Sequence, residues 1–384
     1  MMEDHRRRIR PVGRAKPAAI AVLAALVGTF LAACGSDTGS SSPSTSATDA
    51  KIGFIFVGRK DDYGYNQAAY QGSHEVAQAF PKNKVIIQED VPETDQAAQV
   101  MEQMIGDGAR LIFATSYGHK DAALKVARNH PEVVVVHQGG LVDGTMPDNF
   151  GTYFGTVYEP VYLAGIVAGL TTKTNKLGYV YAFPIPQTRD DVDAFHLGAK
   201  SVNPAVKTIT VSTANWCDPA KQREAARTLL DQGVDVITQH QGCTGMIIKA
   251  TEEAGKFSVG SHVNASALAP KGWLTGSEWR WGPLYTKIVR KILDGKFKGS
   301  EFNANYRAGY KTGDSPFVQS DYGPSVADDM KKKVDEAKAK ISKDGSPFTG
   351  PVVDNKGVTR IPAGTVPDYR TIESIDYFVD GVTG

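Results

Sequence analysis

Polar and aromatic side chains gather directly after the apolar runs of this sequence. The segments that follow the runs are "RKDDYGYNQ" (59–67), "SYGHKD" (116–121), "FPIPQ" (183–187), "NWCDP" (215–219), "HQGCTG" (240–245), "HVNAS" (262–266) and "EWRWG" (278–282). They are rich in aromatics, amides and histidines and poor in basic residues. A phosphate or carboxylate ligand would require Arg or Lys there, whereas a flat aromatic heterocycle requires π faces to stack on and amides at its edge. These residues therefore favour the binding of such a heterocycle.

Catalytic motifs are missing from the sequence. It contains no G-x-S-x-G elbow, no phosphate-binding loop, no G-x-G-x-x-G after a predicted strand and no H-E-x-x-H pair. Four residues could bind a metal, but their spacing matches no recognised zinc pattern; they are His240, Cys243, His262 and Cys217. We therefore expect a binding protein without enzymatic activity, cofactor or metal, and metal binding is the alternative.

The charge of the chain excludes a further class of function. Its 384 residues carry a formal net charge of +1, whereas proteins that bind nucleic acid usually present a basic face. We expect no nucleic-acid partner. A chain of this length can form two domains with hydrophobic cores of their own.

The first 50 residues contain targeting signals. Residues 1–34 join the cationic "HRRRIRPVGRAK" to the apolar "PAAIAVLAALVGTFLAA", which is short for a membrane span. They end in "LAAC", which resembles a bacterial lipobox and predicts lipidation of Cys34; a plain secretory signal is the alternative. Residues 35–50 predict a flexible linker because they are rich in Ser, Thr and Gly. We expect the protein outside the cytoplasm, in the periplasm or at the cell surface, anchored to the cell membrane by lipid.

Short apolar runs alternate with amphipathic stretches from Lys51 onward. Strands are predicted at 51–58, 84–90, 109–116 and 133–139, with helices near 66–80, 95–106 and 119–129. After "GTYFGTVYEP", helices near 160–171, 190–201, 219–232 and 244–254 separate strands at 176–184, 207–215, 234–240 and 256–263. Continuous apolar strands that alternate with helices indicate parallel sheets covered on both faces. We therefore predict an α/β protein with two doubly wound parallel-sheet lobes.

The residues from 270 onward are mixed in character. "GWLTGSEW" favours an extended segment, 283–294 a helix, "VADDMKKKVDEAKAKISK" a charged helix, and "PVVDNKGVTRIPAG" a hairpin that turns at 355–357. A chain that builds one lobe, then another, and then returns forms a hinged molecule. Ligands of parallel α/β sheets bind beyond the carboxyl ends of the strands, so we expect the polar segments named first to face one cleft.

Several motifs, in the right order, resemble those of the basic membrane protein family, the substrate-binding lipoproteins of ABC importers for purine nucleosides and related bases. The motifs are "GFIFVG", "DDYGYNQAAYQG", "LIFATSYGHKDAALKVA", "TYFGTVYEPVYLAGIVAG", "LGYVYAFPIPQ" and "EWRWGPLYTKIV". The resemblance implies a type I periplasmic-binding-protein fold, with three crossovers near 156–158, 274–278 and 312–316. The first lobe would comprise 51–157 and 276–313, and the second 158–275 and 314–384.

The resemblance also implies the partners. We expect a monomer that binds a purine nucleobase, adenine first, or a related nucleoside, and that delivers it to an ABC permease in the membrane. The alternative is a sensory binding protein for another small aromatic or hydroxylated ligand.

The same resemblance places a binding site residue by residue. In "DDYGYNQ", Tyr65 would stack on the purine, Asn66 would contact it, and Asp62 would lie nearby. We expect the ring of Tyr65 to be exposed when no ligand covers it; packing across the lobe interface is the alternative. Tyr117 and Gly118 match the second strand-end loop of the first lobe.

The second lobe would supply the opposing face. Phe183 and Trp216 are its candidate aromatic walls, and Trp216 could instead be a wedge between the lobes. His240, His262 and Asn264 follow adjacent predicted strands. They could hydrogen bond to ring nitrogens or exocyclic groups, or be structural.

One departure from the family's pattern bears on the ligand. Nucleoside-binding members carry acids in the loop after the last strand of the second lobe and a lysine on the following crossover. Here "SHVNAS" forms that loop and Trp279 stands at the crossover. An indole carries no charge and fills volume that a sugar needs, and Asn264 can both donate to and accept from the edge of adenine. We therefore expect a shortened site for a bare nucleobase.

Cys217 and Cys243 are expected to form a disulfide. Each follows a predicted strand of the second lobe, and successive strands usually neighbour each other. Their ends would then lie about 5 Å apart, within the Cα range of a disulfide. Export favours oxidation; two separate thiols are the alternative.

Overall fold

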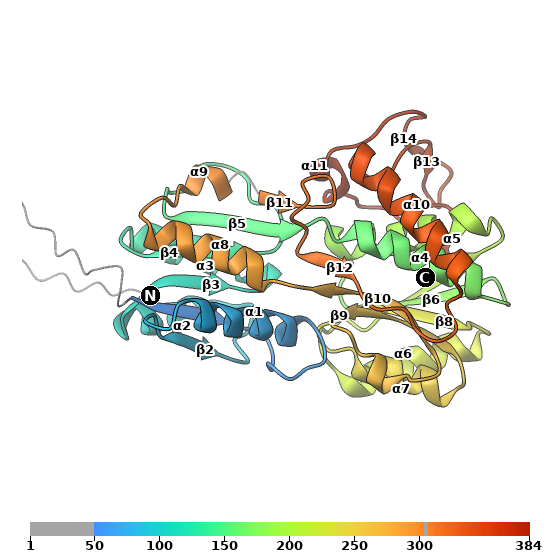
Figure 1. Ribbon diagram of the computed structural model, residues 1–384, viewed down its shortest axis with the longest axis horizontal. Helices are drawn as coiled ribbons and strands as arrows, with labels where there is room; N and C mark the ends of the chain where they lie inside the picture. Colours follow the sequence, from blue (N-terminus) through green and yellow to red (C-terminus); the bar gives the residue numbers. More distant parts are fainter. Residues whose placement is uncertain (1–49, 303–305) are drawn as a thin grey trace, which may run out of the picture. The chain divides into compact units, whose positions relative to one another are not determined.

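Two large β-sheets and a two-stranded one make up the strands of the computed structural model, which describes residues 50–302 and 306–384 (Figure 1). The first sheet has the order β11-β5-β4-β3-β1-β2, and all its neighbouring strands are parallel. Its strands are β1 (Lys51–Ile55), β2 (Val85–Gln88), β3 (Ala109–Ala114), β4 (Val134–Gln138), β5 (Phe150–Gly155) and β11 (Tyr306–Ala308). The first four were predicted. The glycines of "FGTYFG" hid β5, because glycine is disfavoured in strands.

The second sheet has the order β12-β10-β9-β8-β6-β7-β15. Its strands are β6 (Lys176–Tyr181), β7 (Lys207–Ser212), β8 (Val236–His240), β9 (Phe257–His262), β10 (Trp273–Trp279), β12 (Phe317–Gln319) and β15 (Val382–Thr383). Only β12 runs antiparallel to its neighbour within this sheet. The two parallel-dominated sheets confirm the predicted α/β class.

Helices cover both faces of the first sheet. They are α1 (Tyr65–Ala79), α2 (Gln96–Gly106), α3 (Lys120–Asn129), α8 (Gly282–Leu293) and the short α9 (Gly299–Phe302). Phe54 stacks on Phe113 at 4.5 Å between ring centroids and contacts Tyr285 of α8. The next residue, Ile55, belongs to a separate core cluster with Met101 of α2. Successive side chains of a strand point to opposite faces, so α8 and α2 lie on opposite sides of the sheet.

Helices also cover both faces of the second sheet. They are α4 (Tyr158–Thr171), α5 (Pro186–Val202), α6 (Pro219–Asp231) and α7 (Gly245–Glu253), with α10 (Asp328–Asp344) packed against α4. Tyr179 contacts Phe195 of α5, whereas Val180 clusters with Leu229 of α6. The α4 and α5 backbones approach closely, since a Cβ on Gly165 would lie 2.1 Å from the Phe195 carbonyl oxygen.

The chain passes between the two sheets in three places. One passage lies between β5 and α4, one between β10 and α8, and one between β11 and β12. The second passage comes later than expected, because β10 pairs with β9 and β12 up to Trp279. Residues 276–279, which we expected in the first lobe, therefore belong to the second sheet. The other lobe boundaries stay a prediction.

The C-terminal residues form the predicted hairpin. Strands β13 (Val352–Val353) and β14 (Thr359–Ile361) pair in antiparallel fashion, and the buried Asp354 accepts hydrogen bonds from the backbone of Lys356 and Val358. The short helix α11 (Tyr369–Ile372) follows. Within 50–302 and 306–384, no helix is long and apolar enough to cross a membrane. Cys34 and the expected signal and linker lie outside the described residues.

Candidate ligand-binding site

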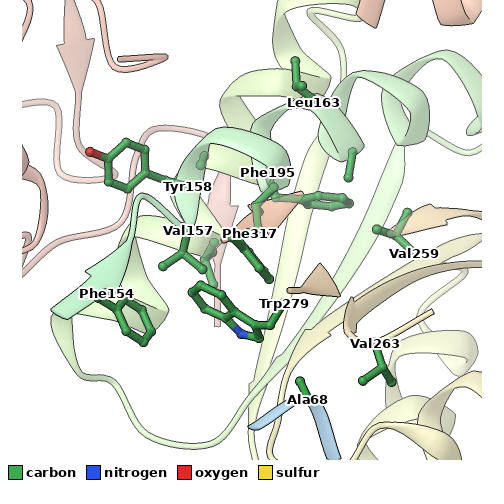
Figure 2. Packing of buried hydrophobic residues seen from close by; sticks show 14 of the residues in the cluster. Ala68, Phe154, Val157, Tyr158, Leu163, Phe195, Val259, Val263, Trp279 and Phe317 are labelled. Atoms are coloured by element: carbon green, nitrogen blue, oxygen red, sulfur yellow. The ribbon is translucent and has the colours of Figure 1, made fainter. Parts of the chain in front are cut away.

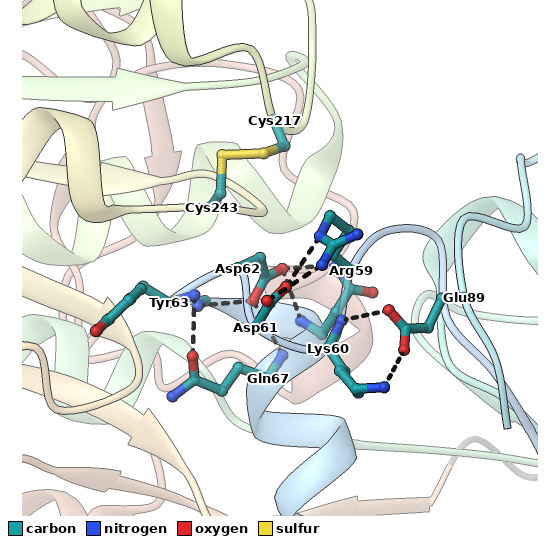
Figure 3. Close-up of polar contacts among 11 residues, drawn as sticks. Arg59, Lys60, Asp61, Asp62, Tyr63, Gln67, Glu89, Cys217 and Cys243 are labelled. Atoms are coloured by element: carbon teal, nitrogen blue, oxygen red, sulfur yellow. Dashed lines mark hydrogen bonds and ion pairs between the residues drawn. A yellow bond between two sulfur atoms is a disulfide. The ribbon is translucent and has the colours of Figure 1, made fainter.

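The turn before α1 is held by Asp62. Its carboxylate accepts hydrogen bonds from the backbone of Gly64 (2.8 Å), Asn66 (3.1 Å) and Gln67 (3.0 Å), and one from the Asn66 side-chain amide (2.7 Å). Figure 3 shows this turn beside the disulfide of the second lobe. These are the backbone N–H groups that a helix start leaves unpaired. Asp62 therefore acts as a helix cap.

Asn66 is also occupied inside the turn. Its side chain is 2% exposed, its amide nitrogen donates to Asp62, and its carbonyl oxygen accepts from the backbone N–H of Gly58 at 3.2 Å. Both ends of the amide thus hold the turn, while Asn66 also lines a cavity between the lobes; its contact with a ligand stays a prediction.

Tyr65 is partly buried rather than exposed, which corrects our expectation. Its hydroxyl accepts from the Gln138 amide at 2.8 Å, and its ring meets the His262 ring edge-on at 5.3 Å. Its backbone N–H donates to the Gly242 carbonyl, 2.9 Å away in the second lobe. The exposed tyrosine of this turn is Tyr63, at 47%. Sequence alone could not show this, because distant elements bury Tyr65.

An inner cavity of about 40 Å³ lies between the strand ends of the two sheets. The residues around it are Val57, Tyr65, Ser116, Tyr117, Phe154, Gln187, Trp216, His240, Gly242 and His262. Five of them were predicted: Tyr65, Tyr117, Trp216, His240 and His262. The cavity has room for a few water molecules, at roughly 10–15 Å³ for each. Its walls are mostly aromatic, and its lining contains no Arg or Lys.

Tyr117 is placed by one residue near the end of β4 and one just after it. A Cβ on Gly140 would lie 2.3 Å from the Tyr117 ring, so only glycine permits this contact. His137 contacts the carbonyl oxygens of Ser116 (3.0 Å) and Tyr117 (3.2 Å) through Nε2. Burial lowers the pKa of His137 to about 3, so this histidine is neutral and donates through Nε2.

An outer cavity of about 730 Å³ shares Val57, Trp216 and Gly242 with the inner one. Its other residues include the charged side chains of Arg59, Asp61, Asp62, Asp90 and Glu93. Phe183 lines the outer cavity only and meets Trp216 edge-on at 5.2 Å. Phe183 therefore packs against Trp216 on the side of the outer cavity. We had expected it to be an aromatic wall of the site, but it does not line the inner cavity.

Glu93 connects the two lobes. One carboxylate oxygen accepts from the Ser116 hydroxyl (2.6 Å) and the Gly118 backbone (2.8 Å), and the other accepts from the Trp216 indole (3.2 Å). A Cβ on Gly118 would lie 2.6 Å from Glu93. Gly118 therefore lets Glu93 approach, and its contact with a ligand stays a prediction.

Two histidines at the ends of β8 and β9 face each other, with ring centroids 5.2 Å apart. His240 contacts Asp191 of α5 through Nδ1 at 2.6 Å. His262 accepts a hydrogen bond at Nδ1 from the Trp279 indole at 3.1 Å. Burial lowers the pKa of His262 well below its ordinary value, so His262 is neutral with its proton on Nε2.

Trp279 lies behind His262 and does not line either cavity. It is 3% exposed and packs on Trp281 (4.2 Å), Phe317 (4.0 Å) and Phe154 (4.8 Å). Figure 2 shows Trp279 with Phe154 and Phe317. Trp279 belongs to the core, so the argument that it fills the space of a sugar is not supported by its position.

Asn264 was expected to contact the edge of a base; it lines neither cavity, and the contact stays a prediction. Its side chain is exposed, and its oxygen accepts from the Ser266 backbone at 3.1 Å, at the start of the 3-10 helix Ser266–Leu268. The amide therefore stabilises a surface turn.

Cys217 and Cys243 are bonded to each other, with Cα atoms 5.1 Å apart. The expected reason was wrong, because β6 lies between β7 and β8. The loop after β7 instead folds over the end of β6, where the Trp216 carbonyl accepts from the Gly242 backbone at 2.6 Å. The bond also removes two donors from the metal-binding alternative.

Sequence reasoning missed Phe154, Gln187, Glu93 and Asp191. Glu93 lies just beyond β2, so the strand-end rule could have found it, and Gln187 ends the segment "FPIPQ". Phe154 lies in the unpredicted β5. Asp191 lies inside a helix, where no local pattern separates a buried carboxylate from a solvated one.

Comparisons with known proteins identify a family and several relatives of this chain. The model of the family "ABC transporter substrate-binding protein PnrA-like" matches residues 50–346. A purine-binding protein of Brucella abortus is 33% identical over 334 residues, which cover 86% of this chain and 92% of that protein. A protein of Haloferax volcanii, named for glucose binding in an ABC transporter, is 29% identical over 338 residues, covering 86% and 80%. A solved ABC transporter solute-binding protein of Aeropyrum pernix has a similar fold, with a TM-score of 0.67, 20% identity and coverage of 85% and 96%.

Proposed function

This chain belongs to the Bmp family of PnrA-like ABC transporter substrate-binding proteins, and we propose that its ligand is a purine nucleobase. The family acts outside the cytoplasm, binds small molecules for an ABC permease and does not catalyse reactions. The ligand, the lipid anchor and the monomeric state are the proposed parts.

The aromatic lining of the inner cavity is the observation that carries the proposal. Tyr65, Tyr117, Phe154 and Trp216 provide π faces from both lobes. Ser116, Gln187 and His240 add a few polar groups. Stacking on an aromatic side chain contributes about 1–3 kcal/mol per base, and a few convergent polar groups fix the orientation of a ligand. A purine has both the flat face and the polar edge that this lining complements.

A compact ligand suits the inner cavity better than a nucleoside. With about 40 Å³ of space, even a base must displace water and push the walls slightly apart. A ribose would have to pass the bond between Trp216 and Glu93 to reach the outer cavity. The small volume of the inner cavity, and not Trp279, therefore favours a base over a nucleoside, with adenine first.

The anchor and the transport role complete the proposal. Lipid on Cys34 would hold a monomer near its permease through the linker. Sensing rather than import remains the alternative for the same binding event, and neighbouring genes for a permease and an ATPase would favour import.

Ligand identification tests the proposal. Mass spectrometry of the denatured purified protein should find a purine, and calorimetry should rank adenine, guanine and hypoxanthine above their nucleosides and above glucose. The variant Tyr65→Ala tests whether the ligand occupies the inner cavity, because it should weaken binding there. Nucleosides or glucose that bind at least tenfold tighter than every base would contradict the proposal.

A further inference from the structure

His240 and Asp191 form a buried pair at the wall of the inner cavity. The pair joins the last residue of β8 to the second turn of α5, and Nδ1 lies 2.6 Å from the carboxylate. The side chains are 8% and 3% exposed. Across the described residues, the second carboxylate oxygen of Asp191 has no hydrogen-bond partner. The hydrogen bond at Nδ1 fixes the orientation of the His240 ring. Only Nε2 can then change between accepting and donating a hydrogen bond.

The Nε2 atom of His240 is open to the ligand. His240 lines the inner cavity, and within 50–302 and 306–384 no hydrogen bond to its Nε2 is present. Within the described chain, this nitrogen is not one of the polar atoms that are fully buried without a hydrogen-bond partner. It therefore remains accessible from the cavity. A ligand in the inner cavity would be its hydrogen-bond partner.

The number of protons on the pair decides what Nε2 can do. When the pair holds one proton, it lies on Nδ1 beside the ionised Asp191, and Nε2 accepts a hydrogen bond. When the pair holds two, Nε2 carries one of them and donates. This holds whether the other proton stays on Nδ1 or moves to the carboxylate. A single proton taken from water therefore converts Nε2 from acceptor to donor.

Burial raises the pKa of the Asp191 carboxyl itself, and the groups around the pair bring little charge to it. From β9, His262 lies 5.2 Å away between ring centroids, and it stays neutral because burial lowers its pKa. On α5, burial raises the pKa of the neighbouring carboxyls of Asp190 and Asp193, so they add little negative charge to attract a proton. Tyr179 of β6 also stays uncharged, because burial raises its pKa. Tyr65 of α1 and Trp216 complete the surroundings.

We propose that the Asp191–His240 pair selects purines by the polarity of the edge group that meets Nε2. A 6-amino group donates to Nε2 and binds with no change in protonation. A 6-oxo group is an acceptor, so it binds only when the pair takes up one proton from solvent, which forms the Nε2–H bond. This inference rests on the proposed function, and it makes His240 a specificity-determining residue and Asp191 a positioning residue.

Proton-linked calorimetry tests the inference. Adenine and hypoxanthine are titrated into the full mature chain between about pH 6.5 and pH 8, in two buffers with different ionisation enthalpies. Adenine should bind with nearly no proton uptake and a flat pH profile. Hypoxanthine should take up nearly one proton, and its affinity should fall by about tenfold per pH unit.

Two variants separate this role from a structural one. His240→Gln cannot titrate, so proton uptake with hypoxanthine should vanish and the preference for adenine should shrink. Asp191→Asn removes the carboxylate that holds the His240 ring, so the difference in proton uptake between the two purines should change, and the exposed His74→Gln should behave like the wild type. Purines that bind with equal proton uptake overturn this inference alone. Failure of every purine to bind overturns the proposed function as well.

Discussion

The indole N–H of Trp216 donates to the carboxylate of Glu93, 3.2 Å away, and this bond joins the loop after β7 to the loop after β2 across the ligand cleft. The same carboxylate is held in its own lobe by Ser116. The bond can form only when the lobes are close together, so it stabilises the closed form and separates the inner cavity from the outer one.

Trp216→Phe should weaken ligand binding by about 10- to 150-fold, because it removes a hydrogen bond to a carboxylate, which contributes about 1.5–3 kcal/mol, while keeping an aromatic wall. Small-angle scattering should show less compaction with ligand. Trp273→Phe is the control: its indole donates to the Asp321 carbonyl at 3.0 Å, away from the cleft. Equal losses of affinity in both variants would show that destabilisation, and not the loss of this bond, is the cause.

Tyr65→Ala should weaken purine binding by about 5- to 150-fold, the equivalent of one lost stack of about 1–3 kcal/mol. Tyr63→Ala changes the exposed tyrosine of the same turn and should leave affinity within about twofold of the wild type. Calorimetry with adenine measures both. A larger loss in Tyr63→Ala than in Tyr65→Ala would place the ligand outside the inner cavity.

The alternating pattern of apolar strands and helices was enough to predict most of both sheets. The same pattern could not predict β11, β12 and β15, which have two or three residues each and pair with distant parts of the chain. Such strands are stabilised by their neighbours rather than by their own composition.

The strand-end segments and the resemblance to the family together predicted five residues that line the inner cavity, but not the orientation of their side chains. Asn66 and Asn264 carry the same amide and lie at comparable strand ends, yet each hydrogen bonds within its own turn. Sequence gives the chemistry of an amide and not its partner. Gln187 is the opposite case. Its amide nitrogen is buried without a partner among the described residues, and the residue lines the inner cavity.

Removal of the disulfide should destabilise the second lobe. The bond spans 26 residues, for which the chain-entropy relation gives about 3.5 kcal/mol. The double variant Cys217→Ser and Cys243→Ser should therefore unfold at lower denaturant concentration, and reduced wild type should match it. Intact mass with and without reductant checks the bond itself. Two free thiols after oxidative folding would contradict the structure.

The stability of the protein should fall as pH rises through the titration of Glu159. Burial raises the pKa of this carboxyl from its ordinary 4.5 to about 7. Between these two values the folded state keeps a proton that the unfolded state has lost, so stability decreases with rising pH. The full effect is roughly 3 kcal/mol.

Denaturant titrations of Glu159→Gln test this. The variant has no carboxyl to titrate, so relative to wild type it should become roughly 3 kcal/mol more stable between about pH 5 and pH 8. The exposed Glu253→Gln is the control. A constant difference between variant and wild type across that range would show that Glu159 titrates normally.

Gly64→Ala should keep the fold and prevent closure of the cleft. Gly64 stands just before α1, and a Cβ there would lie 1.9 Å from the Gly242 carbonyl oxygen of the second lobe. The obstacle is backbone, held by its own hydrogen bond to Trp216, so it cannot turn aside as a side chain would. The methyl group would also separate the Tyr65 N–H from that carbonyl, which it now meets at 2.9 Å.

Each lobe should fold normally, while ligand-induced compaction in small-angle scattering should disappear. Affinity for adenine should fall by at least about tenfold, because one hydrogen bond and the opposing wall are lost. Gly106→Ala adds the same methyl group at the end of α2, where nothing lies within 4 Å, and should bind like the wild type. If Gly64→Ala still compacts and binds adenine as the wild type does, the ligand does not need the close approach of the lobes seen here.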